Sequence, residues 1–324
     1  MAQWMIRVNQ SPANDTIGPV AVPTGGGGMA GLTVVSPSGD TTGVTDSANI
    51  ATAIASGDDV KLARGAFYIA SPITLPPNIE FYGPSLGRIS AGGGDIATTN
   101  AVAIINLGSS WSGAAAIANT APTTGTACNV WNVHLHDLIV VGNSTTICYD
   151  LSNMDWSEIH NLYANGGTVG FKFSFKGNTA PSSTQIPGPR YVHHLYASTP
   201  TTYGFQIEGQ TQTMFSDLYV NGLGVTPVAF HIYGCNTCMF SNLLGQRYLT
   251  TGVDVNKMTW GDASTSGSFG NAFSNLMMIG GTGNTGFAGN GINPAKPIGV
   301  IGLGVSTNAT PTSGVTHFTI AGQY

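Results

Sequence analysis

Charged residues are scarce in this 324-residue chain, and their scarcity limits what the protein can bind. Asp, Glu, Lys and Arg together make up 8% of the residues, whereas about a quarter of a typical globular chain is charged. The 10 basic and 15 acidic residues give a net charge of −5, and no run of Lys or Arg is present to follow a phosphate backbone. Nucleic acid is therefore not expected as a partner.

Long hydrophobic segments are also missing. The N-terminal stretch MAQWMIRVNQSPAND has no uninterrupted apolar run of the length that a secretory signal requires, and no later segment approaches the length of a membrane span. The sequence thus predicts no membrane span. It indicates a protein that either stays where it is made or leaves the cell without a signal peptide.

Cysteine is rare as well. Cys128, Cys148, Cys235 and Cys238 do not look like a disulfide framework in a chain of this length. The CNTC segment at 235–238 has the spacing of zinc ligands, but neither a second CxxC nor an HxxxH follows it. We therefore predict that these small residues fill turn or core positions, and we expect no metal and no cofactor.

What the sequence does contain is a motif that occurs six times. Each copy has a hydrophobic residue, a small or imidazole residue, then Asn, Asp or His, and then Leu. The copies are LHDL at 135, IHNL at 159, VHHL at 192, FSDL at 215, FSNL at 240 and FSNL at 273. Their leucines are 24, 33, 23, 25 and 33 residues apart, so the chain consists of repeats of about two dozen residues, two of which carry insertions.

A second element follows five of these copies. The five segments are TICYDLS from 146, VGFKFSF from 169, YGFQIEG from 203, VAFHIYG from 228 and TGVDVNK from 251. Apolar and polar residues alternate in them, which is typical of a half-buried strand. Each repeat therefore holds at least two short strands, joined by turns rich in Gly, Asn, Ser and Thr.

The repeat length and the strand content together indicate a solenoid. The LxxLxL frame of leucine-rich repeats and the GGxGxD frame of calcium-binding nonapeptide repeats are absent. We predict an all-β fold, a single-stranded right-handed parallel β-helix with three sheets, in which each coil adds about 4.8 Å along the axis. Because one coil cannot bury its own inward face, the inward pattern recurs and should stack Phe215, Phe240 and Phe273 in the interior.

The polar residue before each repeated leucine is expected in a tight turn between two strands. Asn and Asp tolerate left-handed backbone dihedrals, and their side chains can bond the neighbouring coil. Asp137 and Asp217 are therefore interpreted as ladder residues rather than catalytic acids. In the same way His136, His160 and His193, which align with serines in the other copies, are interpreted as a side-chain stack rather than metal ligands.

The segment before the repeats predicts a cap. Residues 45–47, Thr-Asp-Ser, form a helix-capping signal and are followed by Ile50 and Ile54 at helical spacing. Strands are expected at 60–62 and around 67–69. A short amphipathic helix at this point would cover the open hydrophobic end of a solenoid.

This segment resembles the N-terminal capping region of pectate-lyase-like β-helix proteins. The matching positions are Asp46, Ile50, Ala53, Ile54, Val60, Leu62, Gly65, Tyr68, Ile69, Ile73, Leu75, Pro76, Ile79 and Gly83. The resemblance is specific over residues 40–90 and extends through the repeats to about residue 320. It implies the β-helix fold but leaves the function open, because the family includes lyases, glycosidases, epimerases and phage tailspikes.

The motifs of the family's enzymes are not found. Of the NTD, DD, GHG and RIK motifs of polygalacturonase-type hydrolases only Asp58-Asp59 is present, and it lies in the predicted cap. Calcium-dependent lyases need clustered carboxylates and a nearby basic residue, whereas the carboxylates from Asp155 onward are scattered over several repeats. Neither enzyme class is supported by a motif, and enzymatic activity is left open.

Aligning the second strands places polar side chains along one outer face of the predicted β-helix. The outward positions are Asp150, Lys172, Gln206, His231 and Asp254, and two residues later Ser152, Ser174, Glu208, Tyr233 and Asn256. Glu208 and Asp254 would lie two coils apart, about 9.6 Å at the backbone. That is close to the carboxylate separation of an inverting glycosidase.

Three interpretations of this face are open. In a glycosidase groove, Glu208 and Asp254 would be the catalytic acid and base, and His231 would tune one of them. In a glycan-binding groove without catalysis, the contacts would come from Lys172, His231, Tyr233 and Trp156. In the third interpretation the face is only a solvated surface whose mixed charges pair.

The ends of the chain give the domain prediction. Residues 1–28 are an apolar attachment segment with a linker that ends in four glycines, residues 29–90 form the cap and the first coils, and residues 91–324 form the parallel β-helix. This arrangement resembles that of phage tailspikes and tail fibres, which have an N-terminal virion anchor, a pectate-lyase-like shaft and no signal peptide.

The predicted function is that of a phage tail structural or receptor-binding protein that recognises a host-surface polysaccharide. It would assemble as a homotrimer and bind other virion tail proteins through its N-terminal segment. Such a protein belongs to the virion and is extracellular after host lysis. The alternative is a polysaccharide-degrading enzyme, a glycosidase or a lyase, on the same fold. A third possibility, a bacterial surface adhesin, is disfavoured by the missing export signal.

Overall fold

A computed structural model of the protein describes residues 31–86, 102–119, 130–175, 190–259, 265–266, 268, 270–280, 284–289, 298–305 and 315–321. The predicted attachment segment, residues 1–28, lies outside these described residues, so its role and the three-part division of the chain stay predictions. Within the described ranges the chain forms one helix and 25 strands. The structure is therefore mostly β, as the sequence predicts.

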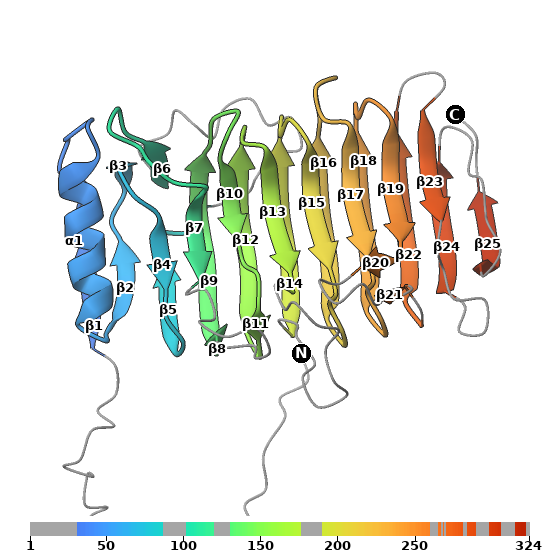
Figure 1. Cartoon of the computed structure of the whole chain (residues 1–324), viewed down its shortest axis with the longest axis horizontal. Coiled ribbons are helices and arrows are strands. Elements are labelled where there is room, and N and C mark those ends of the chain that lie inside the picture. Colours follow the sequence, from blue (N-terminus) through green and yellow to red (C-terminus); the bar gives the residue numbers. More distant parts are fainter. Residues whose placement is uncertain are drawn as a thin grey trace, which may run out of the picture.

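Two long parallel sheets run along the molecule, and over most of the chain consecutive strands alternate between them (Figure 1). The larger sheet has the spatial order β1-β2-β5-β9-β12-β14-β16-β18-β22-β24-β25, with β6 beside β9 and β3 beside β6. The smaller sheet has the order β23-β19-β17-β15-β13-β10-β7-β4. Each strand of a repeat therefore pairs with the equivalent strand of the next repeat.

The strand bounds follow the predicted segments closely. The larger sheet contains β1 (Leu32–Val35), β2 (Asp59–Leu62), β3 (Gly65–Ile69), β5 (Ile79–Tyr82), β6 (Ala103–Leu107), β9 (Val133–Val141), β12 (Glu158–Asn165), β14 (Tyr191–Ser198), β16 (Met214–Asn221), β18 (Met239–Gln246), β22 (Ala272–Ile279), β24 (Ile298–Val305) and β25 (Val315–Ala321). The smaller sheet contains β4 (Ile73–Leu75), β7 (Ala115–Asn119), β10 (Ile147–Asp150), β13 (Val169–Ser174), β15 (Tyr203–Glu208), β17 (Val228–Tyr233), β19 (Thr251–Asn256) and β23 (Thr285–Gly289). Two short pairs complete the set, parallel β8 (Val130–Trp131) with β11 (Met154–Asp155), and antiparallel β20 (Met258–Thr259) with β21 (Thr265–Ser266).

The repeated motif lies in the middle of the long strands of the larger sheet. Its six leucines occupy equivalent positions in β9, β12, β14, β16, β18 and β22 and are paired from one strand to the next. The residue before each leucine has a positive φ, which confirms the predicted left-handed conformation. The φ values are 60° at Asp137, 50° at Asn161, 55° at His194, 55° at Asp217, 54° at Asn242 and 54° at Asn275.

The left-handed residue divides each long strand of the larger sheet into two segments. Three sheets were expected, with the left-handed residue as a turn between two of them. In the structure the pairing with the next repeat is interrupted at that residue and resumes directly after it. In β9 the two segments have different partners, since residues 133–136 pair with β5 and residues 138–141 pair with β6. Each repeat therefore contributes two strand segments to the larger sheet and one to the smaller sheet, and the arrangement as three sheets stays a prediction.

The left-handed positions also form the predicted ladder of side chains. Asn242 Nδ2 donates to Asp217 Oδ1 at 2.8 Å, and Asn275 Nδ2 donates to Asn242 Oδ1 at 3.0 Å. These bonds join side chains of successive repeats. At Asp137 the side chain bonds to neighbouring backbone, since its Oδ1 accepts from the Leu86 N–H at 3.2 Å. The interpretation of Asp217 as a structural residue is confirmed.

The interior contains stacked aromatic rings, as the recurring inward pattern predicts. Phe215 and Phe240 lie 5.1 Å apart between ring centroids, and Phe240 and Phe273 lie 4.7 Å apart, with nearly parallel planes. All three are buried. Close packing of one ring on the next makes each repeat depend on its neighbours for its core.

The predicted histidine stack is present on the outer side of the larger sheet. The ring centroids of His136 and His160 are 4.7 Å apart, and those of His160 and His193 are 5.0 Å apart. His136 Nε2 also lies 3.1 Å from Glu80 Oε1, and its Nδ1 lies 2.8 Å from Asp137 Oδ2. The rings stack face to face instead of converging on a point, so this cluster serves packing and surface hydrogen bonding.

The predicted capping helix is α1 (Val44–Ala55), which lies at one end of the sheets (Figure 1). The sequence signal indicated that Asp46 caps this helix, but in the structure it does not. The N-cap residue is Gly43, which has no side chain to cap the helix. The first N–H groups of α1 instead donate to side chains of the preceding turn, Val44 N–H to Thr42 Oγ1 at 3.4 Å and Thr45 N–H to Asp40 Oδ2 at 2.9 Å. The buried Asp46 carboxylate instead accepts hydrogen bonds from the backbone N–H groups of Ser38 and Tyr68, both at 2.8 Å. It therefore fastens the cap to the preceding loop and to β3.

The described cysteines occupy core positions, as predicted. Cys148, Cys235 and Cys238 are free and buried, whereas Cys128 lies outside the described residues. The Cys235 thiol donates to the Ile207 carbonyl oxygen at 3.5 Å. In the part of the chain that the structure describes, no helix has the length and apolar character needed to cross a membrane.

Candidate functional site

The polar face predicted from the second strands lies on the smaller sheet, and its alignment is correct. Lys172 pairs with Asp150 on one side and with Gln206 on the other, and His231 pairs with Asp254. The second row is also in register, with the pairings Ser174–Glu208, Glu208–Tyr233 and Tyr233–Asn256. Parallel pairing therefore brings together residues that are about two dozen positions apart in the sequence.

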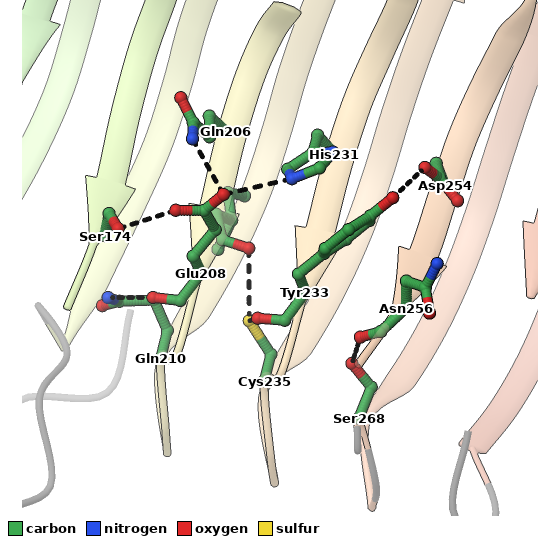
Figure 2. A network of polar contacts seen from close by, with 11 residues as sticks. Ser174, Gln206, Glu208, Gln210, His231, Tyr233, Cys235, Asp254, Asn256 and Ser268 are labelled. Atoms are coloured by element: carbon green, nitrogen blue, oxygen red, sulfur yellow. Dashed lines mark hydrogen bonds and ion pairs between the residues drawn. The ribbon is translucent and has the colours of Figure 1, made fainter. Parts of the chain in front are cut away.

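Glu208 is the centre of a hydrogen-bond network on this face (Figure 2). Its Oε2 accepts from Ser174 Oγ at 2.7 Å, and its Oε1 accepts from Gln206 Nε2 at 2.8 Å and lies 3.1 Å from His231 Nε2. Burial by itself would raise the pKa of Glu208, but the hydrogen bonds from His231, Gln206 and Ser174 outweigh it and lower the pKa to about 2. Glu208 is therefore a carboxylate at neutral pH.

His231 is covered rather than open to a groove, which differs from the expectation of an outward, accessible ring. It stacks between Tyr203, at 4.4 Å between ring centroids, and Tyr233, at 3.6 Å. The residue is buried, and its Nδ1 makes no hydrogen bond within the described residues. The flanking rings come from the preceding strand and from the same strand, so this cover depends on the packing of neighbouring repeats.

Asp254 is held by Tyr233, whose hydroxyl group donates to Asp254 Oδ2 at 2.7 Å (Figure 2). Burial and this hydrogen bond raise the pKa of Tyr233 to about 12. Two bonded pairs, Glu208 with His231 and Tyr233 with Asp254, are thus joined by the stacked rings of His231 and Tyr233.

The chemistry of this network favours a structural role. A glycosidase acid must keep its proton near neutral pH, which requires a raised pKa, and Glu208 has a lowered one. An ionised Glu208 suits a base or a nucleophile, but its oxygens already accept three hydrogen bonds from protein side chains. The catalytic assignment of Glu208 and Asp254 stays a prediction.

Trp156 lies apart from this face, in the turn between β11 and β12. Its side chain is 63% exposed, and the Arg190 guanidinium carbon lies 3.8 Å from the centroid of its ring. Arg190 Nη1 also donates to Gln212 Oε1 at 3.5 Å. The Trp156 ring and the Arg190 side chain therefore form one wall of a surface feature at the start of the long strands.

That feature is a groove of about 610 Å³, which we call the edge groove. Its lining side chains include Trp156, Glu158, Arg190, Tyr191, Met214 and Met239. Glu158, Tyr191, Met214 and Met239 are paired in register, each from the next strand of the larger sheet. The groove therefore runs across successive repeats.

Of the predicted site residues, only Trp156 lines the edge groove. Lys172, Glu208, His231, Tyr233 and Asp254 belong to the smaller sheet. The sequence interpretation missed the large exposed side chains that join Trp156. A signal for three of them was present, because Tyr191, Met214 and Met239 each precede the first hydrophobic residue of a repeat motif. Exposed apolar side chains at the same position of three adjacent strands make this position a candidate for a binding surface.

Comparisons with known proteins do not assign this chain to a family. No model of a protein family matches the chain, and no curated protein matches it. Among solved structures, the pre-mature gene product 12 of bacteriophage phi29 is similar to this chain, with a TM-score of 0.46 and 15% sequence identity. The match covers 80% of this chain and 35% of the phi29 chain, so the protein spans about a third of the length of that relative.

Proposed function

We propose that this protein is a structural and receptor-binding component of a phage tail, a tailspike or tail fibre, which recognises a host-surface polysaccharide through the edge groove. The observation that carries polysaccharide recognition is the pair of exposed aromatic side chains, Trp156 and Tyr191, in an open groove with Arg190 and Gln212 beside them. Aromatic faces pack against the apolar faces of sugar rings, while polar neighbours bind the hydroxyl groups.

The finer fold proposal is a right-handed parallel β-helix of the pectate-lyase-like type. It is supported by the alternation of consecutive strands between two parallel sheets and by the helix at one end. Connections between parallel strands of the same sheet are right-handed in nearly all proteins. A β-helix of this kind would form the shaft of the tail protein, with residues 29–90 as its cap and residues 91–324 as its coils.

The assembly proposal is a homotrimer that is joined to other virion tail proteins by residues 1–28. Its support is the low content of charged residues, since a surface with few charges has little electrostatic repulsion to keep subunits apart. Such a protein is part of the virion and becomes extracellular when the host lyses. Light scattering of the purified chain should give the mass of a trimer, and a stable monomer at micromolar concentration would exclude this assembly.

Recognition is tested by adsorption of the purified chain to immobilised capsule and wall polysaccharides from a panel of bacteria. Trp156→Ala should weaken binding to the recognised polysaccharide by about tenfold, because covering about 60 Å² of the ring at about 25 cal/mol per Å² is worth about 1.5 kcal/mol. Trp131→Ala is the matched control, since Trp131 is also exposed but does not line the groove. Equal binding of Trp156→Ala and the unaltered chain would refute recognition at the edge groove.

The second candidate function is polysaccharide degradation by a glycosidase or a lyase. Its specific support is that Glu208 and Asp254 lie two strands apart on one face of the smaller sheet. The test is release of oligosaccharide from the recognised polymer. We expect none from the unaltered chain, and reproducible release that is lost in Glu208→Ala or Asp254→Ala would favour the enzyme.

A further inference from the structure

The edge groove has an apolar side that sugar hydroxyl groups do not explain. Tyr191, Met214 and Met239 are 55%, 39% and 54% exposed, and they are paired in register on three adjacent strands. Adjacent strands are about 4.8 Å apart, so these side chains form a continuous strip about 10 Å long. Exposed methionines offer flexible apolar surface, which suits methyl and other small apolar groups.

Polar side chains also line the groove. The Arg190 guanidinium group stacks on Trp156 and donates to Gln212, and Glu158 lies in register beside Tyr191. Thr237, which is exposed, also lines the groove near Met239. The groove therefore presents hydrogen-bonding groups and apolar surface in parallel, each over several repeats.

The shape and size of the strip favour a chain-like ligand over a second copy of the protein. A stable protein interface takes about 20–30 residues on each side, and the exposed apolar side chains of the edge groove are far fewer. A linear polymer that lies along successive repeats would instead meet the aromatic rings, the polar side chains and the methionine strip at the same time. The C–H faces of a sugar ring suit the rings of Trp156 and Tyr191, whereas small apolar substituents such as methyl groups suit Met214 and Met239.

We propose that the edge groove selects an acetylated polysaccharide, whose acetyl methyl groups pack against Met214 and Met239 while its rings stack on Trp156 and Tyr191. The amide or ester groups of the acetyl substituents would bond to Gln212 and Thr237, which border the strip. This inference rests on the proposed function, and it adds the chemical class of the ligand. One methyl group in an apolar pocket changes affinity by about tenfold or more.

The test compares three tetrasaccharides with the same β-1,4 linkage, binding to the full chain by calorimetry. They are cellotetraose, the tetramer of glucosamine and the tetramer of N-acetylglucosamine. We expect the N-acetylated tetramer to bind at least about tenfold more tightly than the other two. Saturation-transfer NMR should show the acetyl methyl protons in closest contact with the protein.

The decisive variant is Met214→Gln combined with Met239→Gln, which keeps side-chain length and removes apolar character. It should reduce the preference for the acetylated tetramer over cellotetraose to about threefold or less. Met277→Gln is the matched control, because Met277 is an exposed methionine of β22 outside the groove. Unchanged circular dichroism would show that both variants fold.

The failures of the two proposals can be separated. Equal binding of all three tetramers, weakened by Trp156→Ala, would overturn the acetyl preference and leave polysaccharide recognition standing. A change in sedimentation of the double methionine variant, with no change in sugar affinity, would mean that a second copy covers the strip and would overturn the inference. Absence of binding by every tetramer at millimolar concentration would overturn it too, and the adsorption experiment would then decide polysaccharide recognition by itself.

Discussion

Replacement of Glu208 by Gln should destabilise the protein at neutral pH but not at strongly acidic pH. The substitution keeps the shape of the side chain and removes its charge. In the folded protein the Glu208 carboxylate accepts from Ser174 and Gln206 and contacts His231 Nε2. Glutamine offers one acceptor oxygen in place of two and adds an N–H donor, which would face the donors that already surround this position.

The size of the effect follows from the ionisation of the carboxyl group. The pKa of Glu208 falls from 4.5 to about 2 on folding, and each pKa unit corresponds to about 1.36 kcal/mol. The ionised form therefore contributes about 3 kcal/mol to folding, and the side chain is only 17% exposed, so solvent screening is limited. Because the folded pKa is depressed, this contribution is complete above about pH 5 and is lost as the pH falls from 4.5 towards 2.

The assay is urea unfolding of the unaltered chain and of Glu208→Gln, at pH 7 and at successively lower pH. The difference in the free energy of unfolding should be about 3 kcal/mol at pH 7 and should shrink below pH 4. Glu158→Gln serves as control, since Glu158 forms a more exposed pair with His193 at 3.7 Å and should change stability by about 0.5 kcal/mol or less. A difference between Glu208→Gln and the unaltered chain that stays constant from pH 7 to pH 3 would refute the electrostatic reasoning.

Three further predictions concern the repeats. Asn242→Val should lower the free energy of unfolding, measured in urea, by about 2–3 kcal/mol, because a β-branched residue is strained at a φ of 54° and both ladder bonds are lost. Asn242→Gly should lower it less, since glycine adopts this φ without strain. Equal losses for the two variants would show that backbone strain is unimportant. Phe240→Ala should lower the free energy of unfolding by about 3–5 kcal/mol, and Phe240→Leu by clearly less, because the ring is buried between two stacked phenylalanines. A loss below about 1 kcal/mol for Phe240→Ala would mean that the stack is not part of the core. Burial raises the pKa of the Cys235 thiol well above its ordinary value. A thiol reagent should therefore label Cys235 only after the chain unfolds. Rapid labelling of Cys235 in the native chain would contradict its burial.

The repeat could be predicted in detail because its signals are local. Inward residues such as Leu218 and Phe240 must recur in every repeat to bury the same surface, and the left-handed position must be filled by a residue such as Asn242 that tolerates it. The alternation of polar and apolar residues then fixes which side chains face outward. The register of the polar face followed from these patterns and is confirmed by the strand pairing.

The number of sheets could not be read from the same patterns. A left-handed residue was correctly expected at Asp217 and its equivalents, but sequence does not tell whether strand pairing stops there or continues. In the structure the pairing skips this residue and resumes after it, and in β9 the segments before and after it pair with different strands. Similarly, Asp46 looked like a helix cap, and only the arrangement of β3 beside the helix gave it other partners.

The sequence by itself determined the parallel stacking of repeats, the inward aromatic core and the outward polar rows, since each depends on periodicity along the chain. Only the tertiary structure decided which outward residues are accessible. It covered His231 with the rings of Tyr203 and Tyr233 and held Glu208 as an internal carboxylate. It also brought Arg190 onto Trp156, across a separation of 34 residues that includes one of the insertions. Accessibility and such contacts depend on how turns and rings of different repeats pack in space, and no period in the sequence encodes that packing.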